Sequence, residues 1–167
     1  MLSPARNSVA LDPAARLARL VALAVPALLL GGAYIGQYGF DLYPCEMCWW
    51  QRWPHFAALA LALIAFALPP ARLWTALAGA AILVSAAIGA FHAGVEYKWW
   101  RGITSCARIE PSAPGVSPLD AIMNTPMISC DEPQWTMLGI SLAGFNFLFG
   151  AAGALAILAL IARKDRA

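Results

Sequence analysis

Four long apolar runs that contain no charged residue limit most strongly how this chain of 167 residues can fold. They lie between Arg19 and Asp41, between Arg52 and Arg72, between Arg72 and Glu96, and between Glu132 and Arg163. As a helix, each run is long enough to cross roughly 30 Å of hydrocarbon. Only 12% of the residues are charged, about half of the usual share of roughly 25%, so a soluble core could not bury this much apolar surface. The sequence therefore predicts an all-α membrane protein built as a bundle of four transmembrane helices.

One transmembrane domain, residues 17–162, is predicted between two short tails, residues 1–16 and 163–167. Its helices are expected at about residues 17–37, 45–68, 73–95 and 134–162. The third and fourth helices are joined by a loop of residues 97–133. Within this loop Ser117 suits an N-cap, Pro118 suits the first helical position, and apolar residues follow at helical spacing. We therefore expect a short amphipathic helix that lies on the bilayer surface.

Small residues recur at helical spacing in several of the predicted helices. Gly32 and Gly36 form a G-x-x-x-G pair in the first helix, and the third helix has Ser85 and Gly89 one turn apart. Such residues let membrane helices approach closely. We expect them to lie at contacts between helices.

The distribution of basic residues predicts the orientation in the membrane. The side that both termini share carries seven of them: Arg6, Arg16, Arg19, Arg72, Arg163, Lys164 and Arg166. The opposite side carries four, Arg52, Lys98, Arg101 and Arg108, together with seven acidic residues. Because basic residues favour the cytoplasmic side, both termini are expected in the cytoplasm. The net charge of +2 is small and dispersed, and it does not suggest a nucleic-acid partner.

All four cysteines fall on the side opposite to the termini. They are Cys45, Cys48, Cys106 and Cys130. An even number of cysteines on an oxidising face is typical of two disulfides. Cys45 and Cys48 form a Cys-x-x-Cys motif at a predicted helix start, with Arg52 one turn further on. Since a helix N-terminus and a nearby guanidinium both stabilise a thiolate, the motif indicates reactive cysteines.

Other roles for these residues are open at this point. Four thiolates could hold a structural zinc ion, or the cysteines could form disulfides that only staple the loops. Trp49 follows Cys48 where a c-type haem site needs histidine. A b-type haem between His55 and His92 has no other support. His55 is expected to be a hydrogen-bonded interfacial residue, and His92 either a solvated boundary residue or part of a site.

Several motifs together resemble one known family. The chain has Cys-x-x-Cys-x-x-x-Arg after the first helix, a cysteine pair that brackets the second far-side loop, His-Ala-Gly-Val-Glu at residues 92–96, and Ser-Leu-Ala-Gly-Phe-Asn at residues 141–146. This order is similar to that of the disulfide bond formation protein B (DsbB) family over about residues 20–161. Vitamin K epoxide reductases also have four helices and two cysteine pairs, but in them the loop pair comes first.

The resemblance implies a bacterial inner-membrane enzyme with its cysteines on the periplasmic side. It would reoxidise a thioredoxin-like partner of the DsbA type and pass the electrons to a membrane quinone, ubiquinone or menaquinone, without a metal. The partner would attack Cys106 and release Cys130. Cys130 would then attack Cys45 and leave Cys48 as the thiolate that faces the quinone, with Arg52 and His92 beside it. The alternative is a non-catalytic membrane scaffold or a metal-binding protein with structural disulfides.

Overall fold

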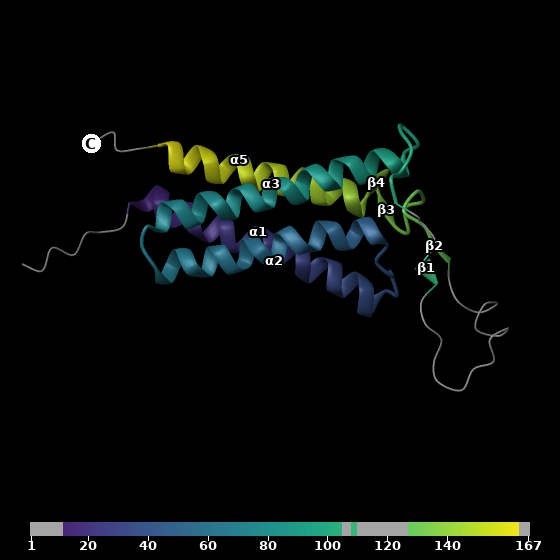
Figure 1. Ribbon diagram of the computed structural model, residues 1–167, viewed down its shortest axis with the longest axis horizontal. Helices are drawn as coiled ribbons and strands as arrows, with labels where there is room; N and C mark the ends of the chain where they lie inside the picture. The colour runs from purple at the N-terminus through teal and green to yellow at the C-terminus, as the bar shows by residue number, and fades with distance from the viewer. Residues whose placement is uncertain (1–11, 105–107, 110–126, 164–167) are drawn as a thin grey trace, which may run out of the picture.

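The computed structural model describes residues 12–104, 108–109 and 127–163 of the chain. Four long helices run alongside one another as a bundle (Figure 1): α1 (Pro13–Gly39), α2 (Glu46–Ala67), α3 (Ala71–Glu96) and α5 (Leu142–Ala162). By length and composition, α1, α3 and α5 could each cross a membrane. The described part of the chain is therefore mostly helical and has the features of a multi-pass membrane protein. The prediction that α2 forms a fourth span stays a prediction.

The first three helices lie close to the ranges expected from the sequence. Asp12 caps α1, since its side chain accepts a hydrogen bond from the Ala14 amide at 3.2 Å, and α1 therefore starts inside the predicted tail. Pro69 and Pro70 follow the end of α2, and α3 begins directly after them. Because this turn is so short, α2 and α3 pack as antiparallel neighbours.

The predicted start of the last helix at residue 134 is wrong, because α5 begins at Leu142. Before it, β3 (Thr136–Met137) pairs antiparallel with β4 (Ile140–Ser141). The turn between them needs positive φ at Leu138 (54°) and Gly139 (78°), which a helix does not allow. Ser141 then caps α5, as its Oγ accepts a hydrogen bond from the Gly144 amide at 3.1 Å.

A second small sheet lies in the long loop before α5. Its strands are β1 (Arg108–Ile109) and β2 (Met127–Ile128), which pair antiparallel. The amphipathic helix predicted near Ser117 lies outside the described residues, as do the ends of both predicted tails.

Small residues build the core of the bundle. Its fully buried members come from all four helices: Ala22, Ala58, Ala62, Ala78, Ile82, Ala154 and Ile157. At Gly89 of α3, a Cβ atom would lie 3.0 Å from the Ala143 carbonyl of α5. The expected contact at this glycine is therefore confirmed. Around Gly32 no described atom lies within 4 Å of the Cβ position, so the first helix makes no close approach there.

The two ends of the bundle differ in what they carry. The start of α1, the α2–α3 turn and the end of α5 lie together at one end, and the four strands lie at the other (Figure 1). The Cys-x-x-Cys motif at the start of α2 lies at the end with the strands. This end therefore gathers the residues that the sequence singles out for chemistry.

Candidate functional site

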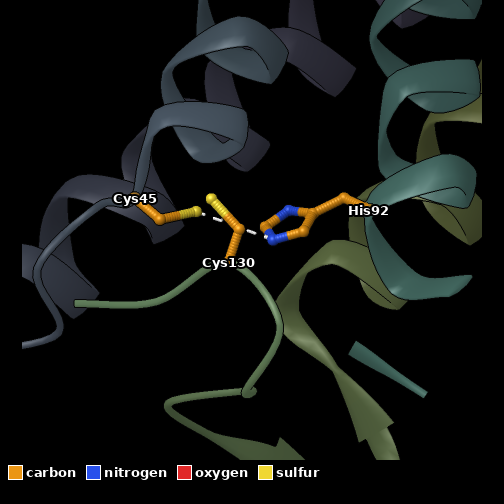
Figure 2. A group of neighbouring side chains, drawn as sticks. All are labelled: Cys45, His92 and Cys130. Atoms are coloured by element: carbon orange, nitrogen blue, oxygen red, sulfur yellow. Dashed lines mark hydrogen bonds between the residues drawn. The ribbon is translucent and has the colours of Figure 1, made fainter. Parts of the chain in front are cut away.

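The loop cysteine Cys130 reaches the Cys-x-x-Cys motif inside the protein. The Cys45 and Cys130 sulfurs and a ring nitrogen of His92 all lie within 4.8 Å of one another. Figure 2 shows the three side chains together, with a dashed line that joins Cys45 to His92 and passes Cys130. Cys45 and Cys130 are 4% and 1% exposed, so the loop covers the motif. The structure thus joins one cysteine of the predicted loop pair to the predicted motif and to His92.

The Cys-x-x-Cys motif forms the first turn of α2. Cys45 is the N-cap residue, and its sulfur accepts a hydrogen bond from the Cys48 amide at 3.3 Å. The Cys45 and Cys48 sulfurs are 3.1 Å apart, longer than a disulfide bond of about 2.05 Å. Both residues are therefore thiols here, at a distance from which a small movement closes the bond.

Contacts from the end of α3 hold the Cys130 segment in place. Lys98 donates hydrogen bonds from its ammonium group to the Asp131 carbonyl at 2.6 Å and to the Asp131 carboxylate at 2.8 Å. The Ser129 hydroxyl donates to the same carboxylate. The Lys98 ammonium, and next the Ser129 hydroxyl, hold the pKa of the Asp131 carboxyl below its usual value. Ile128 adds an apolar contact, since it is buried in one cluster with Met47 and Val95.

His92 belongs to this cluster of side chains, and its burial contradicts the role of a solvated boundary residue. Its side chain is buried, with 1% exposed. Its Nε2 atom lies 3.6 Å from the Cys45 sulfur and 3.7 Å from a carboxylate oxygen of Glu96. The Ser141 hydroxyl donates to the other Glu96 oxygen, which links the cap of α5 to the site.

A chain of buried polar side chains continues from His92 into the bundle. Gln51 lies 2.8 Å from the His92 Nδ1 atom, Asn146 donates to Gln51 at 2.9 Å, and His55 lies 2.8 Å from Asn146. His55 is hydrogen-bonded as expected, but it is only 2% exposed and lies inside the bundle. Gln51 and Asn146 were missed as site residues. The available signal was that both are polar residues on predicted membrane helices.

Arg52 carries a buried positive charge. Its guanidinium donates to the Gln37 side chain at 2.6 Å and lies 4.9 Å from the ring centres of both Tyr34 and Trp49. Within the part of the chain that the structure describes, no carboxylate lies within salt-bridge distance of it. The guanidinium also donates to the Ala33 backbone carbonyl at 3.4 Å. Aromatic faces, one side-chain amide and one backbone carbonyl therefore stabilise a charge that has no counter-ion among the described residues.

A cavity of about 400 Å³ opens beside these residues. Its polar wall includes Cys48, Arg52, His55 and His92, and apolar side chains such as Leu28, Leu29 and Phe149 line much of the rest. A mostly apolar cavity with a few converging polar groups is typical of a small-molecule site. The predicted quinone residues Cys48, Arg52 and His92 thus line one cavity.

Two of the predicted site features stay untested. Cys106 lies outside the described residues, so its pairing with Cys130 remains a prediction. The sulfur and nitrogen atoms of Cys45, His92 and Cys130 are close enough to surround a metal ion, and the expectation that the protein uses no metal also remains a prediction.

Comparison with known proteins gives a consistent assignment. Residues 15–161 match the sequence model of a family described as disulfide bond formation protein DsbB. The chain is 34% identical to disulfide bond formation protein B of Polaromonas naphthalenivorans over 93% of its own length and 96% of that protein. It is also 34% identical to the protein of that name from another Polaromonas strain (90% and 92% covered), and 29% identical to an uncharacterized protein of Rickettsia prowazekii (77% of each). No solved structure matches the chain.

Proposed function

This chain belongs to the disulfide bond formation protein B (DsbB) family, and we propose that it moves electrons from a periplasmic DsbA-type dithiol protein to a membrane quinone. The observation that carries the proposal is the approach of Cys130 to Cys45, within 4.8 Å in a buried site. If Cys130 only formed a structural disulfide within its own loop, it would not need to lie beside the Cys-x-x-Cys motif of α2.

The proposed reaction is a series of thiol–disulfide exchanges. A thiolate of the partner attacks Cys106 of a Cys106–Cys130 disulfide, which forms a mixed disulfide and releases the Cys130 thiolate. Cys130 then attacks Cys45 of a Cys45–Cys48 disulfide. The new bond joins Cys130 to Cys45, the Cys45–Cys48 bond breaks, and its electron pair leaves on Cys48. Cys48 suits a leaving thiolate because it lies in the first turn of α2, where the helix dipole stabilises negative charge.

The mixed disulfide is resolved inside the partner. The partner's second thiolate attacks the partner sulfur that is bonded to Cys106, which forms the partner's disulfide and releases Cys106 as a thiolate. Cys106 then attacks Cys130, which restores the Cys106–Cys130 disulfide and leaves Cys45 and Cys48 reduced. The two electrons and two protons of the partner dithiol are then held by the Cys-x-x-Cys pair.

The cavity beside Cys48 fits a quinone. Cys48, Arg52 and His92 would hold the ring, and the apolar wall with Leu28 and Phe149 would hold the isoprenoid tail. A bound quinone would supply the final acceptor for two electrons and two protons. Such an acceptor is required because DsbA-type partners have potentials of about −120 mV, so a second protein disulfide of similar potential would leave the transfer near equilibrium. Arg52 stabilises negative charge that develops on the ring side of the cavity.

We also propose that the chain lies in the bacterial inner membrane with four spans, both termini in the cytoplasm and the cysteines in the periplasm. Two observations support this orientation. Basic residues are more frequent on the side of the termini, and the start of α1 and the end of α5 lie at the end of the bundle opposite to the strands (Figure 1).

The decisive experiment measures quinone reduction by the purified chain when it is given a reduced DsbA-type protein. We expect turnover with the wild type and none with Cys48→Ala. Given the oxidised partner instead, Cys130→Ala should form a mixed disulfide on a non-reducing gel, because its free Cys106 thiolate attacks the partner's disulfide and displaces the partner's second thiolate. Cys106→Ala should form none. If the wild type reduces no quinone and neither variant traps the partner, the chain is a scaffold or metal-binding protein instead.

A further inference from the structure

Five polar side chains from three helices share one hydrogen-bond network next to the cysteine site. Gln51 and His55 come from α2, Ser85 and His92 from α3, and Asn146 from α5. Gln51, His55, Ser85 and His92 are 6% exposed or less, and Asn146 is partly buried. A side-chain amide can be placed in two orientations that exchange its oxygen and nitrogen, and a neutral imidazole can carry its proton on either nitrogen. Their hydrogen-bond partners decide between these states. Three backbone carbonyls, those of Ser85, Gln51 and Met47, fix the direction of this network.

The orientation of Asn146 follows from Ser85. The Asn146 Nδ2 atom lies 3.1 Å from the Ser85 carbonyl, which can only accept. The Ser85 hydroxyl donates its hydrogen bond to the backbone carbonyl of Gln51 at 2.8 Å. Its oxygen is therefore an acceptor toward Asn146 Nδ2, 3.2 Å away. A reversed amide would place oxygen against both groups. Asn146 therefore donates through Nδ2, and its Oδ1 accepts from His55 Nε2.

The orientation of Gln51 follows from Asn146. Asn146 Nδ2 donates to Gln51 Oε1 at 2.9 Å, and Gln51 Nε2 donates to the Met47 carbonyl at 3.2 Å. A reversed Gln51 would place nitrogen against nitrogen and oxygen against oxygen. The second N–H of Gln51 Nε2 therefore points at the Nδ1 atom of His92, 2.8 Å away.

His92 must accept this hydrogen bond, and an imidazole nitrogen accepts only when it carries no proton. The neighbours of its other nitrogen can all accept, since Nε2 faces the Cys45 sulfur at 3.6 Å and the Glu96 carboxylate at 3.7 Å. We propose that Gln51 and Asn146 are positioning residues that keep His92 a neutral imidazole with its proton on Nε2, pointing toward the sulfurs. Neither residue touches the reacting sulfurs in this role, since both act through His92.

The consequence for sulfur chemistry rests on the proposed function. A neutral imidazole donates a hydrogen bond to a thiolate and stabilises it, but it has no spare proton to transfer. An imidazolium at the same place could protonate the thiolate and stop its attack on a disulfide. The amide chain thus makes His92 a hydrogen-bond donor and prevents it from acting as an acid.

The test is ¹⁵N NMR of the ring nitrogens in the reduced, full-length protein in detergent micelles. The chain has only two histidines, so His55→Gln assigns both rings. For the wild type we expect His92 with Nε2 protonated and Nδ1 bare at neutral pH. A proton on Nδ1 of wild-type His92 would overturn the proposal, and this result needs no substitution, partner or quinone. It is therefore independent of whether the chain reduces a quinone.

Gln51→Glu tests the role of the amide, because a carboxylate cannot donate to Nδ1 and instead attracts a proton there. We expect His92 in this variant to gain a proton on Nδ1 while His55, which faces the unchanged Asn146, keeps its spectrum. Gln134→Glu is the matched control, since Gln134 is an exposed residue that contacts the Tyr43 carbonyl outside the network; His92 should not change in it. An unprotonated Nδ1 in Gln51→Glu, or the same change in Gln134→Glu, would show that Gln51 does not set the state of His92.

Discussion

Arg52 brings a positive charge into the bundle, and its contacts distinguish it from a simple membrane anchor. An anchoring arginine extends its head group into water, but this side chain is only 6% exposed and lies between the rings of Tyr34 and Trp49. Its planar group can keep these stacking contacts and still donate into the cavity that it shares with Cys48.

We therefore expect Arg52→Ala to lower kcat/KM for quinone on the order of 100-fold. Arg52→Lys keeps the charge but loses the planar fork, so its loss should be smaller, roughly 10-fold, and seen mainly as a higher KM. Exchange between the partner and the loop cysteines should survive in both variants, which a gel assay of the mixed disulfide checks. Normal quinone kinetics in Arg52→Ala would mean that Arg52 serves only as a structural residue.

Asp131 and Lys98 give the docked Cys130 segment a defined pH response. The Asp131 pKa is lowered by Lys98 and then by Ser129, so the ion pair stabilises docking above the usual carboxyl pKa of about 3.9 and is lost only as the pH falls through the lower, folded value. We expect docking to stay constant between about pH 5 and 8 and to weaken below about pH 4. Reaction with a pyridyl disulfide reagent measures this when the Cys130 rate is divided by that of Asp131→Asn at the same pH, both in chains that retain no other cysteine, because the ratio cancels the ordinary pH dependence of a thiol.

Asp131→Asn should make Cys130 react faster at neutral pH, by a few-fold at most, because both partners of the pair are exposed and screened by water. Added salt should increase the wild-type rate toward that of the variant. A ratio of wild-type to Asp131→Asn rates that changes steeply between pH 5 and 8 would assign the control of docking to another group.

Among single residues, the sequence predicted those whose surroundings are set by their neighbours along the chain. Cys45, Cys48 and Arg52 were found because a helix start and one turn of helix define their surroundings. Gln51 and Asn146 were missed, because their roles depend on the register of three helices, which spacing along one helix does not contain.

At the scale of the helices, Gly89 sets how closely α3 and α5 approach. A Cβ there would lie 2.9 Å from Asn146 Nδ2, 3.0 Å from the Ala143 carbonyl and 3.1 Å from the Phe147 amide. Two of these three atoms are backbone, so a methyl group can be accommodated only if the helices move apart. Such a movement also pulls Asn146 away from Gln51.

Gly89→Ala should therefore destabilise the fold by about 1–3 kcal/mol, which corresponds to a fall in Tm of roughly 3–10 °C. Thermal unfolding in detergent measures it. Gly31→Ala is the matched control, because no described atom lies within 4 Å of its Cβ position, and its Tm should stay the same or rise slightly. Equal Tm values for the two variants would mean that α3 and α5 tolerate a wider spacing at this crossing.

The surroundings of these glycines and the start of α5 explain which predictions about the helices failed. Small residues identified the contact at Gly89 but also suggested one at Gly32, because spacing shows that a helix can approach another and not that a neighbour is present. The last helix was placed too early, since the apolar run continues through Trp135 and Met137, and only the turn at Leu138 and Gly139 separates the hairpin from α5.

For the whole molecule, the division of the bundle into two unlike ends gives a test of topology. In spheroplasts whose disulfides have been reduced, a membrane-impermeant thiol reagent should label the native cysteines from outside. A cysteine introduced by Ala71→Cys, in the turn at the opposite end, should be labelled only after the membrane is broken. It is tested in a chain that lacks the other four cysteines. The reverse pattern would overturn the proposed orientation.

The general architecture was predictable because long uncharged runs leave few alternatives in a membrane. Hydropathy alone is less clear for α2. The structure places α2 in the bundle, although among the described helices only α1, α3 and α5 have the length and composition of spans. The polar residues that lower the hydropathy of α2 are those that form the site, Gln51, Arg52 and His55 among them.

The burial of Cys45 beneath the Cys130 segment also makes the site selective by kinetics. With Cys130 held beside it, Cys45 meets one thiol at the high effective concentration of an intramolecular reaction, on the order of millimolar or more. Small thiols in the surrounding medium compete only by diffusion, and Cys45 is 4% exposed. In the proposed function, the docked segment would therefore keep small thiols from reducing the motif, while electrons would enter from a protein that engages the loop.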